Sequence, residues 1–227
     1  MPLDPTLKLR PGRPSDVPAL ADIFLDAFSG NPIGQNFFPR DTPSARSFWT
    51  NTLTEEIHDP KVNFLVVTAT KDHASPSSAD QDEQPIIAFA KWVRPLPPGT
   101  PQAPWPADDE WPADGDPPRA AVFFRKLAGM HEEIMGARAH WYLEIIVTRA
   151  AHQGRGAGAM LMQWGAERAD REGVECYLDA TPAGKPLYER FGFRDAVETW
   201  PFFDEQYRHS FMVRKPKGWQ EGVNESS

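Results

Sequence analysis

One stretch, residues 141–159, constrains the fold of this chain most strongly. It begins with an apolar run, residues 141–147, that is interrupted only by Glu144. A run of this length and character predicts a strand that is buried on both faces of a sheet. After a short polar connection, residues 153–158 (QGRGAG) open an amphipathic helix. We therefore expect a central strand that leads into a helix through a glycine-rich turn.

The glycine-rich turn has a chemical use. Residues 154–158 contain three glycines, so an anion can approach the backbone N–H groups at the start of the helix without meeting side chains. These N–H groups have no partner within the helix, and the helix dipole also favours negative charge at this end. The turn therefore predicts a phosphate-binding site and a phosphorylated cofactor.

Two other phosphate-binding motifs fit the turn less well. The Walker motif ends in Gly-Lys-Ser/Thr, but no Lys lies between Lys126 and Lys185. The dinucleotide fingerprint G-x-G-x-x-A does match residues 154–159, and Asp179 follows at a plausible distance. That fingerprint places its first glycine directly after the strand, whereas residues 148–153 intervene here. A nicotinamide-dependent oxidoreductase is therefore the weaker alternative.

A longer pattern around the turn resembles a known family. Gln153-x-x-Gly156-x-Gly158 is similar to the Q/R-x-x-G-x-G/A turn of the GNAT superfamily of acyl-CoA N-acyltransferases. Residues 181–193 are similar to the family's closing pattern, in which a helix bears a tyrosine, here Tyr188, four residues before Gly-Phe. The chain is identified by this resemblance as a member of the superfamily, in its small-molecule-type branch. The resemblance implies a mixed α/β sheet of the GNAT type, with a splayed parallel pair of strands flanked by helices.

The resemblance also implies acetyl-CoA as the co-substrate. In this family the central strand binds pantetheine through its backbone, the glycine turn binds the pyrophosphate, and a tyrosine protonates the departing thiolate. The residues that match these positions are Ile146, Val147, Thr148, Gln153, Gly154, Arg155, Gly156, Ala157, Gly158, Ala159 and Tyr188. We therefore expect Tyr188 to be the general acid. Two positions depart from the residues of many members, with Ala150 in place of Pro and Thr181 in place of Asn.

Glu144 is the candidate general base. An unpaired carboxylate within an apolar strand is costly, so Glu144 either has a structural partner or serves the reaction. Its position on the strand that leads into the turn favours a catalytic role, directly or through water. Asp179, near the end of the next predicted strand, is the competing carboxylate. Since strand residues alternate between two faces, the sequence leaves open which carboxylate points into the cleft.

The resemblance places the acceptor pocket at the first two predicted helices and the loop between them. Phe28 ends the first helix, and Phe37 and Phe38 lie in the loop. These three residues and Asp179 are the expected acceptor-binding residues. The implied reaction is direct attack of an amine on the thioester, with a small-molecule amine as the expected acceptor and a peptide amine as the alternative. A non-catalytic acyl-CoA-binding or partner-binding protein of the same fold is the rival interpretation.

Composition argues against several other functions. The chain has 227 residues, of which 40% are hydrophobic and 25% charged, as is typical of a globular protein. Its net charge of −8 argues against a nucleic-acid-binding protein. The single Cys176 excludes an internal disulfide, and the six histidines lack the spacing of a metal site. No apolar run suits a signal peptide or a membrane span, so we expect a cytoplasmic protein with no metal and no membrane partner.

The remaining periodicities predict a single domain, residues 1–227, with its core at 6–214. Helices are expected at 15–29, 43–57, 119–136, 156–171 and 182–191, and strands at 6–10, 62–68, 86–93, 141–147, 174–179, 193–200 and 207–214. Loops are expected at 33–39 and, with a flexible character, at 71–85; residues 216–227 are expected to be a frayed tail. The Pro/Trp-rich segment 95–118 is either an extended surface connection or, through Trp105 and Trp111, a partial lid over the cleft.

Overall fold

The computed structural model describes residues 4–70, 84–97, 100, 106–107 and 109–219. Most of the loop expected at 71–85, Trp105 and the tail from residue 220 lie outside the described residues.

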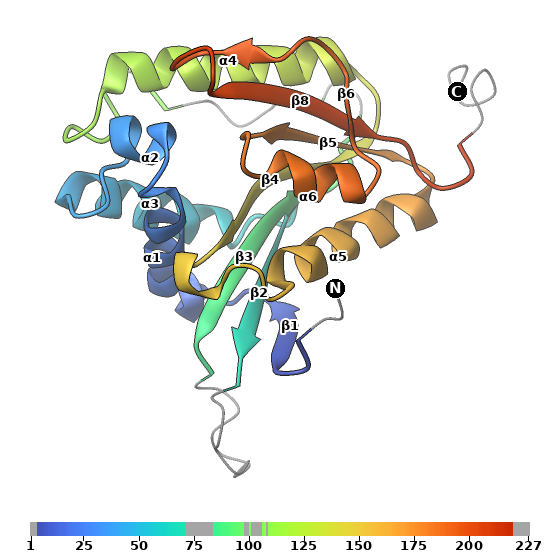
Figure 1. Ribbon diagram of the computed structural model, residues 1–227, viewed down its shortest axis with the longest axis horizontal. Helices are drawn as coiled ribbons and strands as arrows, with labels where there is room; N and C mark the ends of the chain where they lie inside the picture. The colour runs from blue at the N-terminus through green and yellow to red at the C-terminus, as the bar shows by residue number, and fades with distance from the viewer. Residues whose placement is uncertain (1–3, 71–83, 98–99, 101–105, 108, 220–227) are drawn as a thin grey trace.

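Within the described residues, eight strands form one sheet in the order β1-β2-β3-β4-β5-β8-β6, with β7 paired to β8 (Figure 1). The strands are β1 (Leu7–Pro11), β2 (Val62–Ala69), β3 (Ile86–Val93), β4 (His140–Thr148), β5 (Glu175–Ala180), β6 (Arg194–Asp195), β7 (Trp200–Pro201) and β8 (Arg208–Arg214). Only β4 and β5 are parallel to each other, because a helix connects them and returns the chain to the same end of the sheet. The predicted mixed α/β sheet is confirmed.

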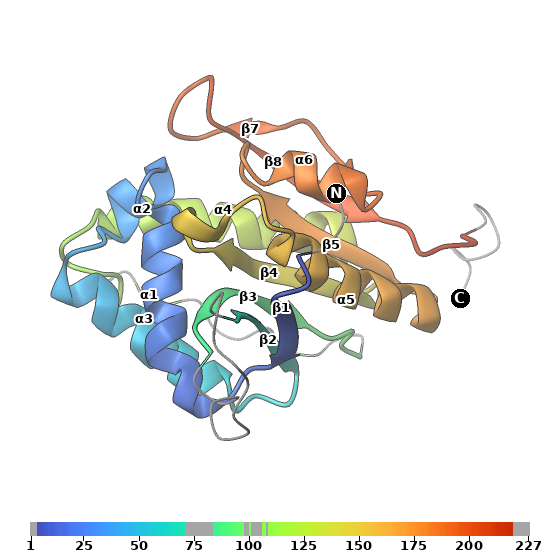
Figure 2. The same cartoon turned by 60° about the horizontal axis from the view of Figure 1, so that its bottom comes forward.

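Helices cover both faces of this sheet (Figures 1 and 2). They are α1 (Val17–Phe28), α2 (Pro32–Phe37), α3 (Pro43–Glu56), α4 (Pro117–Met135), α5 (Ala157–Glu172) and α6 (Lys185–Arg190). Helices α1, α3 and α4 pack on one face, where Phe24, Trp49 and Phe123 join the sheet residues of one apolar core. Helix α5 packs on the other face. There a Cβ at Gly165 would lie 2.3 Å from the Trp92 ring, so the glycine permits the close approach of helix and sheet.

The parallel strands β4 and β5 separate part of the way along their length. Their pairing runs from His140 opposite Glu175 to Leu143 opposite Leu178 and then stops. At the same point the β3–β4 ladder shifts its register and skips Glu144. A bulge of this kind bends the strand and redirects its side chains. The end of β4 therefore has backbone groups that face a gap rather than β5.

The segment expected as a loop at 33–39 instead contains helix α2. The Asn31 side chain accepts hydrogen bonds from the backbone N–H groups of Ile33 and Gly34, and Pro32 occupies the first helical position. Asn at the cap followed by Pro is a favourable helix start. Gly30-Asn31-Pro32 thus both ends α1 and begins α2.

Two other expectations need correction. The strand expected at 193–200 is reduced to the two-residue strands β6 and β7, which pair with β8 at separate places. The connection before α4 is not a purely extended surface segment, because Trp111 is only 5% exposed and packs into the helical core. Among the described residues, no helix is both long and apolar enough to cross a membrane.

Candidate active site

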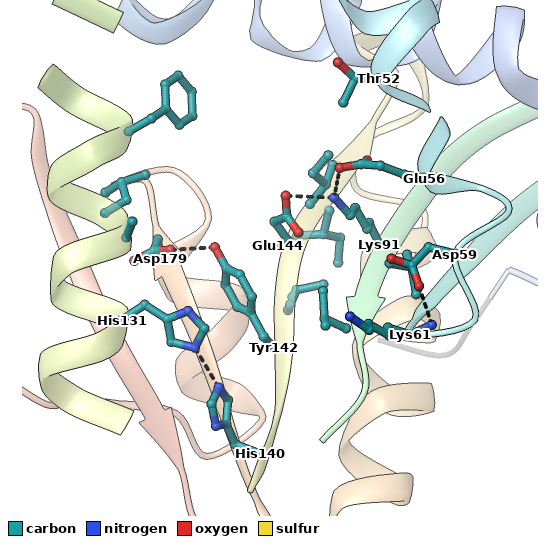
Figure 3. Close-up of a pocket in the computed structure, with 18 of the residues that line it drawn as sticks. Thr52, Glu56, Asp59, Lys61, Lys91, His131, His140, Tyr142, Glu144 and Asp179 are labelled. Carbon is teal, nitrogen blue, oxygen red and sulfur yellow. Dashed lines mark hydrogen bonds and ion pairs between the residues drawn. The ribbon is translucent and has the colours of Figure 1, made fainter. Parts of the chain in front are cut away.

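A cavity of about 490 Å³ lies between the sheet and helices α1, α3 and α4 (Figure 3). Strands β3, β4 and β5 line its sheet side, including the place where β4 and β5 separate. Lys91, Glu144, Asp179 and Tyr188 all line it, each from a different element of structure. Both carboxylates predicted as candidate bases therefore face one cavity.

Glu144 forms a charged cluster with Lys91 and Glu56 (Figure 3). The Lys91 ammonium donates to Glu144 at 2.8 Å and also to Glu56 of α3. Burial would lower the pKa of Lys91, but the charges of the two carboxylates outweigh it and raise that pKa. Burial is also the main cause that raises the pKa of Glu56 to about 7. The Lys91 cation thus serves two carboxylates, and the Glu144 side chain remains 30% exposed to the cavity.

Asp179 accepts hydrogen bonds from two tyrosine hydroxyls, one on its own strand β5 and one on β4. The Tyr177 hydroxyl donates to Asp179 at 2.7 Å, and the Tyr142 hydroxyl donates at 3.1 Å. Burial raises the pKa of Asp179 to about 7, the two hydrogen bonds oppose the rise, and the nearby charge of Glu144 adds to it. A carboxyl group with this pKa exchanges a proton readily near neutral pH.

A pair of histidines, of which His131 is buried and His140 half-buried, lies beside these tyrosines. His131 of α4 stacks on Tyr177, with ring centroids 4.4 Å apart. His140 uses Nδ1–H to donate to the Arg138 carbonyl, so its Nε2 accepts from His131 Nε2 at 2.6 Å. Burial, followed by the neighbouring His140, lowers the pKa of His131 to about 3. His131 is therefore neutral at physiological pH and provides a flat surface behind the Asp179 cluster.

Tyr188 lines the cavity from α6, where the gap between β4 and β5 opens. Its side chain is buried, and burial raises its pKa above the ordinary value for tyrosine. The phenol therefore carries its proton at neutral pH. The hydroxyl lies against Gly184, where an added Cβ would come within 2.8 Å. We find no hydrogen-bond partner for this hydroxyl among the described residues, which leaves it able to donate to a ligand.

The glycine turn lies between β4 and α5, after a short 3-10 segment (Ala150–His152). Gly154 and Gly156 have φ values of 78° and 99°, a left-handed conformation that favours glycine. Gly156 is the N-cap of α5, and no side chain caps the helix there. The first N–H groups of α5 are thus available to an anion, which fits the phosphate group that the sequence predicts.

Arg155, in this turn, is not a free cation, because its guanidinium is paired with residues near the start of the described chain. Its guanidinium forms an ion pair with Asp4 at 2.8 Å and donates to the Thr6 hydroxyl at 3.0 Å. Hydrogen bonds from Thr6 and from Arg155 lower the pKa of Asp4 to about 2. Arg155 therefore ties the turn to the start of the chain, and the anion-binding capacity of the turn comes mainly from backbone N–H groups.

The structure brings together most, but not all, of the residues predicted for the acceptor. Phe28, Phe38 and Asp179 line the cavity. Phe37 does not. It is 1% exposed and packs against the rings of Phe123 and other residues in the core. Cys176 is also buried, and burial raises its pKa to about 12, as expected for a core thiol rather than a nucleophile.

Sequence reasoning missed Lys91, Glu56 and Tyr142. Lys91 is a single charged residue within the apolar run of β3, as Glu144 is in β4. Two lone charges of opposite sign in predicted neighbouring strands were a usable signal for an ion pair. Glu56 and Tyr142 gave no such signal, because their approach depends on helix packing and on the bulge. Among the described residues, no group of three or more His, Cys, Asp and Glu side chains is arranged to bind a metal ion.

Comparison with known proteins identifies the fold. The chain matches the acetyltransferase (GNAT) family over residues 80–193. A solved structure described as histone acetyltransferase HPA2 and related acetyltransferase, from Corynebacterium glutamicum, is 21% identical, with a TM-score of 0.60 and coverage of 93% of this chain and 97% of that chain. The PaiA N-acetyltransferase from Thermoplasma acidophilum, in complex with coenzyme A, is 12% identical, with a TM-score of 0.50 and coverage of 92% and 98%.

A third similar structure is the C-terminal condensation domain of Ebony, in complex with beta-alanyl-dopamine. It is 12% identical, with a TM-score of 0.61 and coverage of 94% of this chain and 99% of that chain. At these identities the structural likeness shows a shared fold. Because the family match spans half of the sequence and includes both β4 and the glycine turn, the chain belongs to the GNAT acetyltransferase family.

Proposed function

We propose that this protein transfers an acetyl group from acetyl-CoA to the amine of a small molecule. The observation that carries the proposal is the position of the gap between β4 and β5. On one side of the gap lies a turn with free N–H groups, and on the other lies a cavity with the carboxylates of Glu144 and Asp179 and a protonated phenol. A cofactor with a phosphate end and a reactive thioester end would connect these two sites.

The cofactor half rests on backbone groups. Along Ile146, Val147 and Thr148, the alternate N–H and C=O groups that do not pair with β3 face the gap and are offered to the amides of pantetheine. The turn, residues 153–159, offers N–H groups for the pyrophosphate. Membership of the GNAT family supports an acyl-CoA as the bound group.

The acceptor half rests on the two carboxylates, to which we assign different roles. Glu144 shares the single Lys91 ammonium with Glu56 and remains partly exposed to the cavity. Its carboxylate is therefore suited to accept a further hydrogen bond from the acceptor's ammonium group near the gap. Asp179, with its pKa near 7, is suited to remove the proton from that ammonium. This assignment moves the base from Glu144, the expected residue, to its competitor.

The reaction follows from these positions. The acceptor's ammonium loses a proton to Asp179, and the lone pair of the resulting neutral amine attacks the thioester carbon. A C–N bond forms, and the carbonyl oxygen becomes an oxyanion that a backbone N–H at the edge of β4 can stabilise. The C–S bond then breaks, and the thiolate takes the Tyr188 proton. The nitrogen, still positively charged after the attack, loses its second proton through solvent, and this proton restores the Tyr188 phenol. The products are an amide and free coenzyme A, and the protein contributes mainly proximity, orientation and proton transfer.

A thiol-release assay tests the proposal. Acetyl-CoA should bind in calorimetry, and amines should accelerate the release of free thiol, with the acetylated amine identified by mass. Binding without acceleration by any amine or peptide would favour the non-catalytic alternative. A melting temperature that rises with a nicotinamide dinucleotide and not with acetyl-CoA would contradict the assignment of the turn.

A further inference from the structure

The wall of the cavity opposite the sheet is aromatic. Helices α1, α3 and α4 each contribute one half-buried phenylalanine to it: Phe28, Phe48 and Phe124. Trp49 and Phe123 also line the cavity, but their rings are buried among neighbouring side chains. Because Phe28 and Phe48 are only half-buried, their rings have apolar surface available to a ligand, whereas Trp49 and Phe123 are almost fully covered by their neighbours.

These rings are already fixed in place by stacking. Trp111 lies between two of them, stacked on Phe48 with centroids 5.5 Å apart and on Phe124 with centroids 4.8 Å apart. Phe28 stacks on Phe24 with centroids 4.5 Å apart. A flat ligand can pack on such a surface without ordering it first, and aromatic pairs gain more than their buried area alone provides.

Polarity is divided across the cavity. The carboxylates of Glu144 and Asp179 lie on the sheet side, at the gap, and the phenylalanines lie on the helix side. Glu56 of α3 also lines the cavity, but its carboxylate is paired with Lys91 of the sheet. A ligand that matches this division has a cationic amine at one end and an apolar body at the other. A long acceptor with polar groups along its length would have to place some of them against the rings, where they lose their hydrogen bonds to water. The free-energy cost of this desolvation exceeds the gain from a cation–π contact with a ring.

The cavity also limits the size of the acceptor. Its volume of about 490 Å³ is within the range of roughly 300–1,000 Å³ that is typical of sites for whole small molecules. A single aromatic ring joined by a short chain to an amine can place its ring against the phenylalanines and its amine near the carboxylates, and it fits the available volume.

We infer that the acceptor is a primary amine carried on a flat aromatic body, and that Phe28 and Phe48 select it. The inference rests on the proposed function, because the amine must reach the thioester at the gap. It goes further by excluding linear polyamines and lysine side chains as the preferred acceptors.

The experiment compares matched acceptors with acetyl-CoA. The panel contains 2-phenylethylamine, 2-cyclohexylethylamine of similar size but without a flat ring, n-butylamine, spermidine and a lysine-containing peptide. We expect kcat/KM for 2-phenylethylamine to exceed that for n-butylamine by about tenfold to a hundredfold, because the ring is buried on binding. The cyclohexyl compound should fall between these two.

Two variants and one control test the wall itself. Phe28→Leu and Phe48→Leu should each reduce the preference for 2-phenylethylamine over n-butylamine about threefold to tenfold, mainly through KM, with unchanged acetyl-CoA affinity. Phe202→Leu is the matched control, because Phe202 is a half-buried ring that packs on Phe123 outside the cavity lining. The control should keep the wild-type preference. Using both wall variants covers the case in which one of them fails to fold.

The possible outcomes separate the inference from the proposed function. Faster turnover of spermidine or the peptide, or equal turnover of the phenyl and cyclohexyl compounds, overturns the inference and leaves acetyl transfer standing. If no amine is acetylated, calorimetry with 2-phenylethylamine on the coenzyme A-saturated protein decides. Binding that the wall variants weaken supports the aromatic site and overturns the transferase function, whereas no binding overturns both.

Discussion

Asp179 and Glu144 lie on the two strands that separate, yet their surroundings differ. Asp179 is half-buried with two tyrosine donors, whereas Glu144 is more exposed and has an ammonium partner. Because burial raises the pKa of Asp179 to about 7, we expect kcat/KM to fall as the pH drops below about 7. Asp179→Asn should remove this acidic limb and lower kcat by roughly 10²–10⁴. The measurement is the pH dependence of thiol release, with one amine used throughout.

Two further variants should move the same limb in opposite directions. The charge of Glu144 contributes to the raised pKa of Asp179, so Glu144→Gln should shift the limb to lower pH and raise the KM of the amine. The Tyr177 hydroxyl bond opposes the rise, so Tyr177→Phe should shift the limb to higher pH. If Glu144→Gln abolishes the limb and Asp179→Asn does not, Glu144 is the base after all.

Tyr188 provides a second prediction at the residue scale. Its hydroxyl has no partner among the described residues, so Tyr188→Phe removes a proton donor and no structural bond. We expect kcat to fall by roughly 10²–10⁴, with little change in acetyl-CoA affinity or melting temperature. Gly184→Ala is a useful companion variant, because its Cβ would crowd the Tyr188 hydroxyl and should reproduce part of the loss. A lower melting temperature for Tyr188→Phe with normal kcat would instead assign the ring to packing.

At the scale of elements, the sequence predicts β4, the turn and α5 well because local rules decide them. A long apolar run predicts β4, closely spaced glycines predict the turn, where two of them have positive φ, and an amphipathic stripe predicts α5. The same rules missed α2, because they indicate only the end of the preceding helix at Asn31-Pro32, although this pair also begins α2. They also could not predict the charged cluster of Lys91 and Glu56, since it joins α3 to β3 across 35 residues of sequence. Both carboxylates were found, but the roles that we propose for them depend on those distant neighbours.

The start of α5 allows a test that separates helix stability from phosphate binding. Ala159 lies in the first turn of α5, three residues after the N-cap Gly156. An Asp at this position interacts favourably with the helix dipole, so Ala159→Asp should keep or slightly raise the melting temperature of the free protein. The same charge repels a bound phosphate, and we expect the affinity for acetyl-CoA to fall at least about tenfold. Calorimetry and thermal unfolding measure the two effects.

Ala159→Asn is the matched control for this variant. It has nearly the same size as Asp but no charge, so its loss of affinity should be much smaller. Equal losses in the two variants would attribute the effect to bulk rather than to repulsion. Unchanged affinity in Ala159→Asp would contradict a phosphate site at the start of α5.

At the scale of the whole molecule, the sheet consists of two parts that meet at a short seam. One part contains β1 to β4 and the other contains β5, β8 and β6, and four residue pairs of β4 and β5 join them. Helix α5 follows from the first part and packs mainly on it, whereas α6 and Tyr188 belong to the second. A cofactor in the gap would therefore contact both parts at once.

We predict that acetyl-CoA stabilises the two parts together. At a concentration of about 100 Kd, it should add about 2.7 kcal/mol to the free energy of unfolding and raise the melting temperature by roughly 5–10 °C. Hydrogen exchange should slow at the alternate residues of 144–148 whose N–H groups face the gap rather than β3, and at 154–159 in the turn, because both would donate to the cofactor. Coenzyme A without the acetyl group should give nearly the same protection, since the predicted contacts are to pantetheine and phosphate. Protection confined to the turn, with unchanged exchange at 144–148, would show that the cofactor does not enter the gap between β4 and β5.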